Sequence, residues 1–203
     1  DILTAQKDSK PINQAQLNGL INSLGNSIKP SYTEEVRTTG KAPTLPNSSL
    51  YNIDPNNPNG YLVETDPTFA NYKKWLSSSY MMQRLDLDPN NMHKRLGDGY
   101  YEQGLIRDQV MALTGKRYLG DYTNDDDMYQ GLMDNAITTA KTLNLRPGVA
   151  LTAEQMAQLT TDIVWLVEQT ITLKDGSKQT VLVPKIYVRA NVSDLKGDGS
   201  LID

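Results

Sequence analysis

The sequence contains one histidine and no cysteine, so few of its side chains can act as acid, base or nucleophile near neutral pH. The absence of cysteine excludes disulfides, iron–sulfur clusters, thiolate zinc sites and a cysteine nucleophile. The single histidine excludes metal sites built from several imidazoles. His93 lies in the cationic string Met92-His93-Lys94-Arg95 at a predicted helix start. This position favours a surface or capping role over catalysis.

Two acidic strings deserve a test as cation sites. Asp125-Asp126-Asp127 are consecutive on one predicted helical turn, so their carboxylates point in different directions, and we interpret them as favourable charges at a helix N-terminus. The stretch from Asp194 to Gly199 resembles a calcium loop but lacks its D-x-D-x-D-G spacing and distal Glu, which favours a Gly-rich turn. We therefore predict no catalytic residue, no cofactor site and no metal site.

The most unusual local string is Gly97-Asp98-Gly99-Tyr100-Tyr101-Glu102. Its spacing differs from the dinucleotide-binding fingerprint, and no strand is predicted before it. Neighbouring tyrosines on a helix point about 100° apart, so one ring can be exposed, and exposed tyrosine suits interfaces. The alternative is that both rings pack under the Pro/Asn-rich arm at the N-terminus. The candidate interaction residues are Tyr100, Tyr101, Trp75 and Tyr72.

Length and charge narrow the class of protein. A chain of 203 residues forms one domain, or one domain with an appendage. Its net charge of −4 has the wrong sign for a nucleic-acid binder, and it has no apolar run of about 18–20 residues to span a membrane. It begins at Asp1 without a Met or a signal peptide, so we expect a segment of a longer protein. Its 11 Tyr stand against one Phe and two Trp, and it has 10 Pro.

Start signals and apolar periodicity predict helices in the middle of the chain. Asp66-Pro67 and Asp88-Pro89 each pair a capping carboxylate with proline at the first helical position. The first signal precedes an apolar face at Phe69, Tyr72, Leu76 and Tyr80. The second precedes a long helix, roughly Met92 to Leu113, with an expected break at 97–99 because glycine weakens helices. Further helices are predicted from near Thr123 and from Thr152, where Gln155 completes a capping box.

After residue 160 the apolar period changes from 3.6 to 2, which predicts a β-hairpin. Its turn is Lys174-Asp175-Gly176-Ser177, whose Asp-Gly pair suits a two-residue connection. Pro184 lies in the return strand, 179–188, and cannot donate a hydrogen bond to a neighbouring strand. We therefore predict an edge strand or a bulge at Pro184.

The predicted fold class is α+β, with a mainly helical body, a C-terminal β-hairpin and an irregular Pro/Asn-rich N-terminal arm. The arm, 1–60, contains one short predicted helix around Leu17–Leu24, and either lies over the core or acts as a flexible linker. The body with its hairpin covers 61–190. The family resemblance described below implies that residues 191–203 connect to a following repeat stalk.

Several strings resemble a segment of very large exoproteins secreted by two-partner systems of Gram-negative bacteria. This family comprises the filamentous haemagglutinins and the effectors of contact-dependent growth inhibition, and the resemblance spans about Leu45 to Leu201. The strings that carry it are Tyr61–Phe69, Tyr72–Leu76, His93–Gln103, Leu145–Met156 and Asp162–Glu168.

The resemblance implies a place in the central non-repeat region, between β-helical haemagglutinin-repeat stalks. That region includes a receptor-binding part and a Tyr/Pro-enriched part associated with export arrest, and the toxin domain lies at the far C-terminus. We therefore expect a non-catalytic module that recognises a target-cell receptor or controls export, and no enzyme. A structural insert joining two stalks, or an adhesin module, is the alternative.

The resemblance also implies partners and a location. Expected partners are an outer-membrane receptor on a target bacterium or the cognate outer-membrane transporter, together with the flanking β-helix repeats of the same chain. No nucleic acid and no cofactor are expected. The expected location is secreted or cell-surface, in association with the outer membrane.

Overall fold

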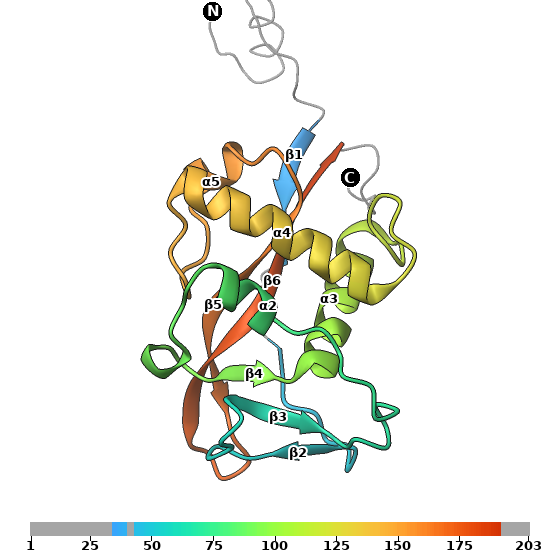
Figure 1. Cartoon of the computed structure of the whole chain (residues 1–203), viewed down its shortest axis with the longest axis vertical. Helices are drawn as coiled ribbons and strands as arrows, with labels where there is room; N and C mark the ends of the chain where they lie inside the picture. The colour runs from blue at the N-terminus through green and yellow to red at the C-terminus, as the bar shows by residue number, and fades with distance from the viewer. Residues whose placement is uncertain (1–33, 40–42, 192–203) are drawn as a thin grey trace, which may run out of the picture. The chain divides into compact units, whose positions relative to one another are not determined.

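The computed structural model describes residues 34–39 and 43–191 (Figure 1). Residues Val36–Arg189 form one compact unit, and this unit is described below. The elements, in chain order, are β1 (Glu34–Arg37), β2 (Tyr51–Ile53), β3 (Tyr61–Thr65), α2 (Ser79–Arg84), the 3-10 helix η3 (Pro89–Asn91), β4 (Arg95–Gly97), α3 (Gly99–Thr114), α4 (Asp125–Leu143), α5 (Ala153–Ala157), β5 (Ile163–Thr172) and β6 (Lys178–Asn191).

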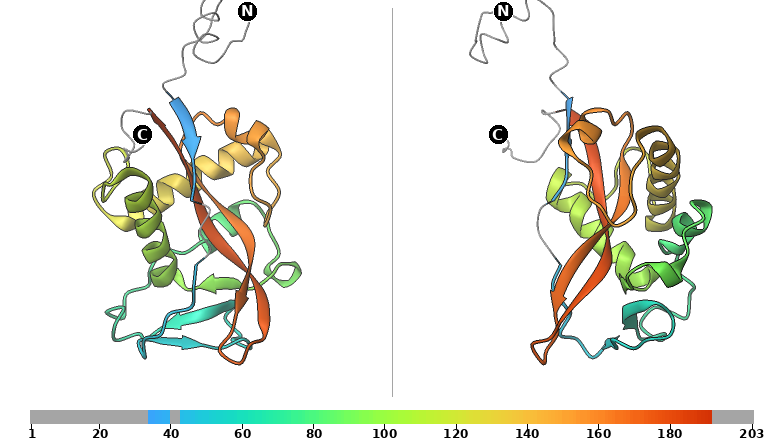
Figure 2. Two further views of the ribbon diagram at one scale, coloured as in Figure 1. Left: turned by 180° about the vertical axis from the view of Figure 1, so that it is seen from behind. Right: turned by 90° about the vertical axis from the view of Figure 1, so that its left-hand side faces the viewer.

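The strands form one mixed sheet in which β6, the last strand of the chain, lies in the interior. The order is β1-β6-β4-β3-β2, and β5 pairs with β6 outside this path. Strand β4 pairs in parallel with both β3 and β6, with Tyr61 opposite Arg95 and Arg95 opposite Leu182. Strands β2 and β5 are antiparallel to β3 and β6, respectively. The two views of Figure 2 show β5 and β6 as a long twisted ribbon.

Aliphatic side chains from distant parts of the sheet form its core. Helix α4 packs against β5 and buries Met128, Leu132 and Met133. Burying these apolar surfaces is the main term that stabilises the unit. The central cluster on the strands consists of Leu62, Val63, Leu96, Ile171, Val181 and Val183.

The predicted α+β class and the C-terminal hairpin are confirmed. The helix expected near Thr123 is α4, capped by Asn124, whose Oδ1 accepts from the backbone N–H of Asp127 at 2.8 Å. The capping box at Thr152 and Gln155 opens α5. The hairpin connects through a turn in which Gly176 has φ +89, a value that favours glycine.

The helix predicted after Asp66-Pro67 is wrong. Asn71 and Tyr72 have φ of 61° and 52°, left-handed values that end a helical path, and α2 begins only at Ser79. The long helix predicted over Met92 to Leu113 is also wrong in its first part, because β4 occupies Arg95–Gly97. The expected break at 97–99 is where α3 starts, since Asp98 Oδ1 accepts from the N–H of Tyr101 at 3.0 Å.

The sequence predicts an edge strand or a bulge at Pro184. In the structure Pro184 lies in β6, a strand with neighbours on both sides. A helix side chain takes the place of a strand neighbour at this point. Gln109 Nε2 donates to Pro184 O, and the N–H of Ile186 donates to Gln109 Oε1, both at 2.9 Å. A carboxamide carries the same donor and acceptor as a peptide group, so it completes the pairing that proline interrupts.

Two further predictions fall outside the described residues: the short helix around Leu17–Leu24 and the turn from Asp194 to Gly199. The described part of the expected irregular arm contributes β1 and β2 to the sheet.

Candidate functional site

Five aromatic rings meet edge to face where β2, the 66–76 segment and α3 come together. Their centroids lie 5.0–6.3 Å apart, in the preferred arrangement of aromatic pairs. Trp75 is held by a hydrogen bond from its Nε1 to Ala70 O at 3.0 Å. We call this group the aromatic cluster; its members are Tyr51, Phe69, Trp75, Tyr100 and Tyr101.

The structure brings three of the four candidate interaction residues into this cluster. Tyr100 and Tyr101 are both intermediate in exposure, between the exposed and the packed alternatives. Tyr101 packs on Gly97, where a Cβ would lie 2.4 Å from its ring. Burial raises the pKa of Tyr101 to about 12, so its hydroxyl stays protonated and donates to Thr44 O at 3.3 Å. Tyr72 lies outside the ring contacts and is 77% exposed.

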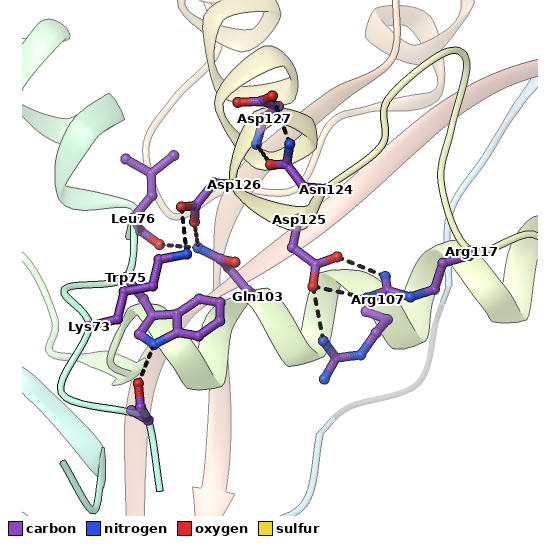
Figure 3. Close-up of polar contacts among 11 residues, drawn as sticks. Lys73, Trp75, Leu76, Gln103, Arg107, Arg117, Asn124, Asp125, Asp126 and Asp127 are labelled. Carbon is purple, nitrogen blue, oxygen red and sulfur yellow. Dashed lines mark hydrogen bonds and ion pairs between the residues drawn. The ribbon is translucent and has the colours of Figure 1, made fainter. Parts of the chain in front are cut away.

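A polar junction adjoins the aromatic cluster, between α3 and the start of α4 (Figure 3). Lys73 Nζ lies 4.0 Å from the centre of the Trp75 ring and 3.1 Å from Asp126 Oδ2. Gln103 Nε2 donates to Asp126 Oδ1 at 2.6 Å and to Leu76 O at 2.9 Å. The junction therefore ties the 73–76 segment to both helices.

The other two carboxylates of the acidic string, Asp125 and Asp127, bind different partners from Asp126. Arg117 donates twice to Asp125, at 2.7 and 3.0 Å, and Arg107 donates once at 3.2 Å. The hydrogen bond from Arg117 is the largest cause that lowers the pKa of Asp125. Asp127 Oδ2 accepts from Asn124 Nδ2. The three carboxylates diverge, and within 34–39 and 43–191 no three His, Asp or Glu side chains converge on a metal position.

Helix α3 also carries a buried carboxyl group, at the end of the unusual string, to which the sequence assigned no role. Glu102 is 0% exposed, and its oxygens accept from Ser78 N at 2.7 Å, Ser78 Oγ at 2.6 Å and Tyr129 Oη at 2.9 Å. Burial raises the pKa of Glu102, although the charge of Arg95 and these donors act in the opposite direction. Because no substrate reaches it, this group has a structural role.

His93 meets a carboxylate on a distant strand. Its Nε2 lies 3.6 Å from Glu168 Oε2, and both side chains are about half exposed. The sequence drew attention to His93 but did not indicate Glu168 as its partner, because only the folded sheet brings the two together. Imidazole and carboxylate are side-chain types that general acid–base catalysis uses.

Among the residues that the structure describes, none of the helices is long and apolar enough to cross a membrane. No family model matches the chain, and no solved structure matches it. Curated relatives do match. Toxin CdiA of Yersinia pestis is 41% identical over 89% of this chain, tRNA nuclease CdiA-2 of Burkholderia pseudomallei is 42% identical over 78%, and 16S rRNA endonuclease CdiA of Enterobacter cloacae is 35% identical over 70%. The chain spans only 4–5% of these relatives' own length.

These relatives correct two expectations. The sequence predicted a non-catalytic module and no enzyme, whereas the relatives carry the names tRNA nuclease and 16S rRNA endonuclease. The net charge of −4 was a poor guide because a charge summed over one segment says nothing of the rest of a long protein. Nucleic acid is therefore not excluded as a partner.

Proposed function

We propose, from its kinship with the CdiA-like family, that this chain is a segment of a toxin protein that cleaves RNA in other bacteria. The observation that carries the proposal is the identity of 35–42% with relatives named for tRNA or 16S rRNA cleavage. Relatives with different named RNA targets share this segment. The features they share therefore cannot by themselves decide which RNA is cut.

The described part of the chain offers one pair of groups to such a reaction. RNA cleavage without a metal needs a base that takes the proton of the 2′-hydroxyl and an acid that protonates the leaving oxygen. Glu168 and His93, 3.6 Å apart and half exposed, are groups of the right kind in reach of solvent. Glu102 is unsuited, because it is completely buried.

The test is incubation of the full-length protein with total bacterial RNA, followed by gel separation of tRNA and 16S rRNA. We expect loss of intact tRNA or rRNA; intact RNA after incubation with active, folded protein would contradict the proposal. The variants His93→Gln and Glu168→Gln locate the acid and base. A loss of cleavage of about a hundredfold assigns these roles to the pair, and unchanged cleavage places the acid and base elsewhere in the protein. Glu154→Gln, at an exposed position on α5, is the matched control.

We also propose the finer points of the resemblance: a place in the central non-repeat region, export by two-partner secretion and association with the outer membrane. An outer-membrane receptor or the cognate transporter would then be the partner. The small share of the relatives that the chain spans supports a place within a much longer protein. A photo-crosslinking residue in place of exposed Tyr72 should capture an outer-membrane protein on cells, and one in place of exposed Lys141 should not. Equal capture from both positions would contradict this partner.

A further inference from the structure

A cleft of about 500 Å³ is bounded by α3, by the β5–β6 ribbon and by Thr39, Pro43 and Thr44, beside the aromatic cluster. Figure 2 shows α3 next to β6, and the hydrogen bonds of Gln109 to Pro184 and Ile186 join them. A cleft of this volume is in the range of small-molecule sites. Its walls are formed mainly by Tyr101, Leu105, Gln109, Gln169, Val183 and Pro184.

One wall of the cleft carries a carboxamide whose hydrogen bonds are incomplete. Gln169 Oε1 is buried and has no hydrogen-bond partner among residues 34–39 and 43–191. Gln109, across the cleft, uses both ends of its carboxamide on β6. A buried polar atom without a partner costs free energy, and a donor bound in the cleft recovers it once the Gln169 side chain turns this oxygen toward the cleft. Rotation of the Gln169 carboxamide by 180° exchanges its oxygen and nitrogen, so this side chain can present either a donor or an acceptor.

The other lining groups restrict the chemistry of a ligand. Asp108 and Lys185 bring opposite charges to the cleft, which gives no preference for an ion of either sign. Leu105 and Val183 provide apolar contact. The Tyr101 hydroxyl remains protonated at neutral pH and can also accept a hydrogen bond.

We propose that this cleft binds a small, uncharged, mainly apolar molecule that carries a primary carboxamide. The ligand's carboxamide pairs with that of Gln169, each group donating to the other, and its apolar part lies against Leu105 and Val183. The site is independent of the RNA cleavage proposed above. Its test needs no RNA.

The experiment uses two probes of nearly the same shape, benzamide and acetophenone, which differ by an amino group and a methyl group. Binding to the 203-residue chain is measured by NMR titration. Benzamide should bind about threefold to tenfold more tightly, the effect of one net hydrogen bond. Gln169→Met, which keeps the side-chain length, should bind both probes equally. Gln158→Leu, at an exposed position, should keep the preference.

A second variant tests the position of the site. Ala112→Phe adds a ring at an exposed position on the cleft wall and should weaken binding of both probes without unfolding the chain. Three results would overturn the proposal: no binding of either probe, equal binding of both probes to the unaltered chain, and a preference for benzamide that persists in Gln169→Met.

Discussion

Glu102 on α3 and Asp125 at the start of α4 are two carboxylates that differ in how deeply they are buried. Glu102 is completely buried and receives three hydrogen bonds from Ser78 and Tyr129. Asp125, at the start of α4, has a side chain that is 14% exposed and receives its hydrogen bonds from Arg107 and Arg117, which are far more exposed. Burial thus raises the pKa of Glu102, while the arginine partners lower the pKa of Asp125.

The comparison shows that the number of hydrogen bonds is a poor measure of what a carboxylate contributes. Glu102 and Asp125 each accept three. If Glu102 is removed, no water can reach its buried donors to accept their hydrogen bonds. If Asp125 is removed, water solvates the exposed arginines that bound it. The two sites should therefore respond very differently to substitution.

The largest effect is expected for Glu102→Leu. This change leaves the N–H and hydroxyl of Ser78 and the hydroxyl of Tyr129 buried without an acceptor. We expect the free energy of unfolding to fall by about 3 kcal/mol or more, because each stranded donor costs roughly 1–3 kcal/mol. Urea unfolding of the purified chain measures it, and a loss below about 1 kcal/mol would show that the donors find other partners.

The matched variant Glu102→Gln should change the free energy of unfolding at pH 7 by only about 1 kcal/mol. The amide oxygen keeps the hydrogen bonds from Ser78 N and Tyr129, and the amide nitrogen can donate to Ser78 Oγ. Destabilisation as large as that of the leucine variant would mean that the negative charge itself is required.

The contributions of Glu102 and Asp125 to the free energy of unfolding should change with pH in opposite directions. The pKa of folded Glu102 lies above its usual value of 4.5, so its contribution to stability is greatest below pH 4.5 and falls as the pH rises through the folded pKa. The pKa of folded Asp125 lies below its usual 3.8, so its contribution is present above pH 3.8 and is lost as the pH falls through the folded pKa. Differences in unfolding free energy between the unaltered chain and Glu102→Gln or Asp125→Asn, measured from pH 3 upward, isolate the two slopes. If both contributions changed with pH in the same direction, the contrast between the buried Glu102 and the arginine-paired Asp125 would be contradicted.

The smallest effect is expected for Asp125→Asn at neutral pH. Loss of the ion pairs with Arg107 and Arg117 should lower the free energy of unfolding by about 0.5 kcal/mol, and by less in high salt. Asp127→Asn is the control, since the donor to Asp127 Oδ2 is the neutral side-chain amide of Asn124, three residues earlier. Salt-independent loss in Asp125→Asn would indicate packing rather than charge.

The sequence predicted the elements whose signals are local. The start of α4 at Asn124, the capping box at Thr152 and the Asp175-Gly176 turn each combine a fixed chemistry with a nearby apolar period. It missed β3 and β4, which have five and three residues, because such strands show no clear period and are defined by distant partners. Arg95, for instance, pairs with Leu182.

The candidate site was predictable to the same extent. The string around Tyr100 and Tyr101 indicated candidate interaction residues, and in the structure the Tyr100 ring contacts Trp75 while the Tyr101 ring contacts Tyr51. The partners Glu168 of His93 and Ser78 of Glu102 could not be predicted, since long-range folding alone brings them together. The orphan oxygen of Gln169 likewise has no signature in the sequence.

The interior position of β6 sets the order in which the molecule can be completed. This strand contacts β5 on one side and the β4 region on the other, yet it is the last element of the described chain. A chain that emerges from its N-terminus, whether from a ribosome or through a pore, therefore leaves one edge of β4 without a partner strand, and the carboxamide of Gln109 without its bonds to β6, until residues 178–191 arrive. Strands β2, β3 and β4 can pair with one another before then, but the sheet is complete only when β6 joins β4 to β5.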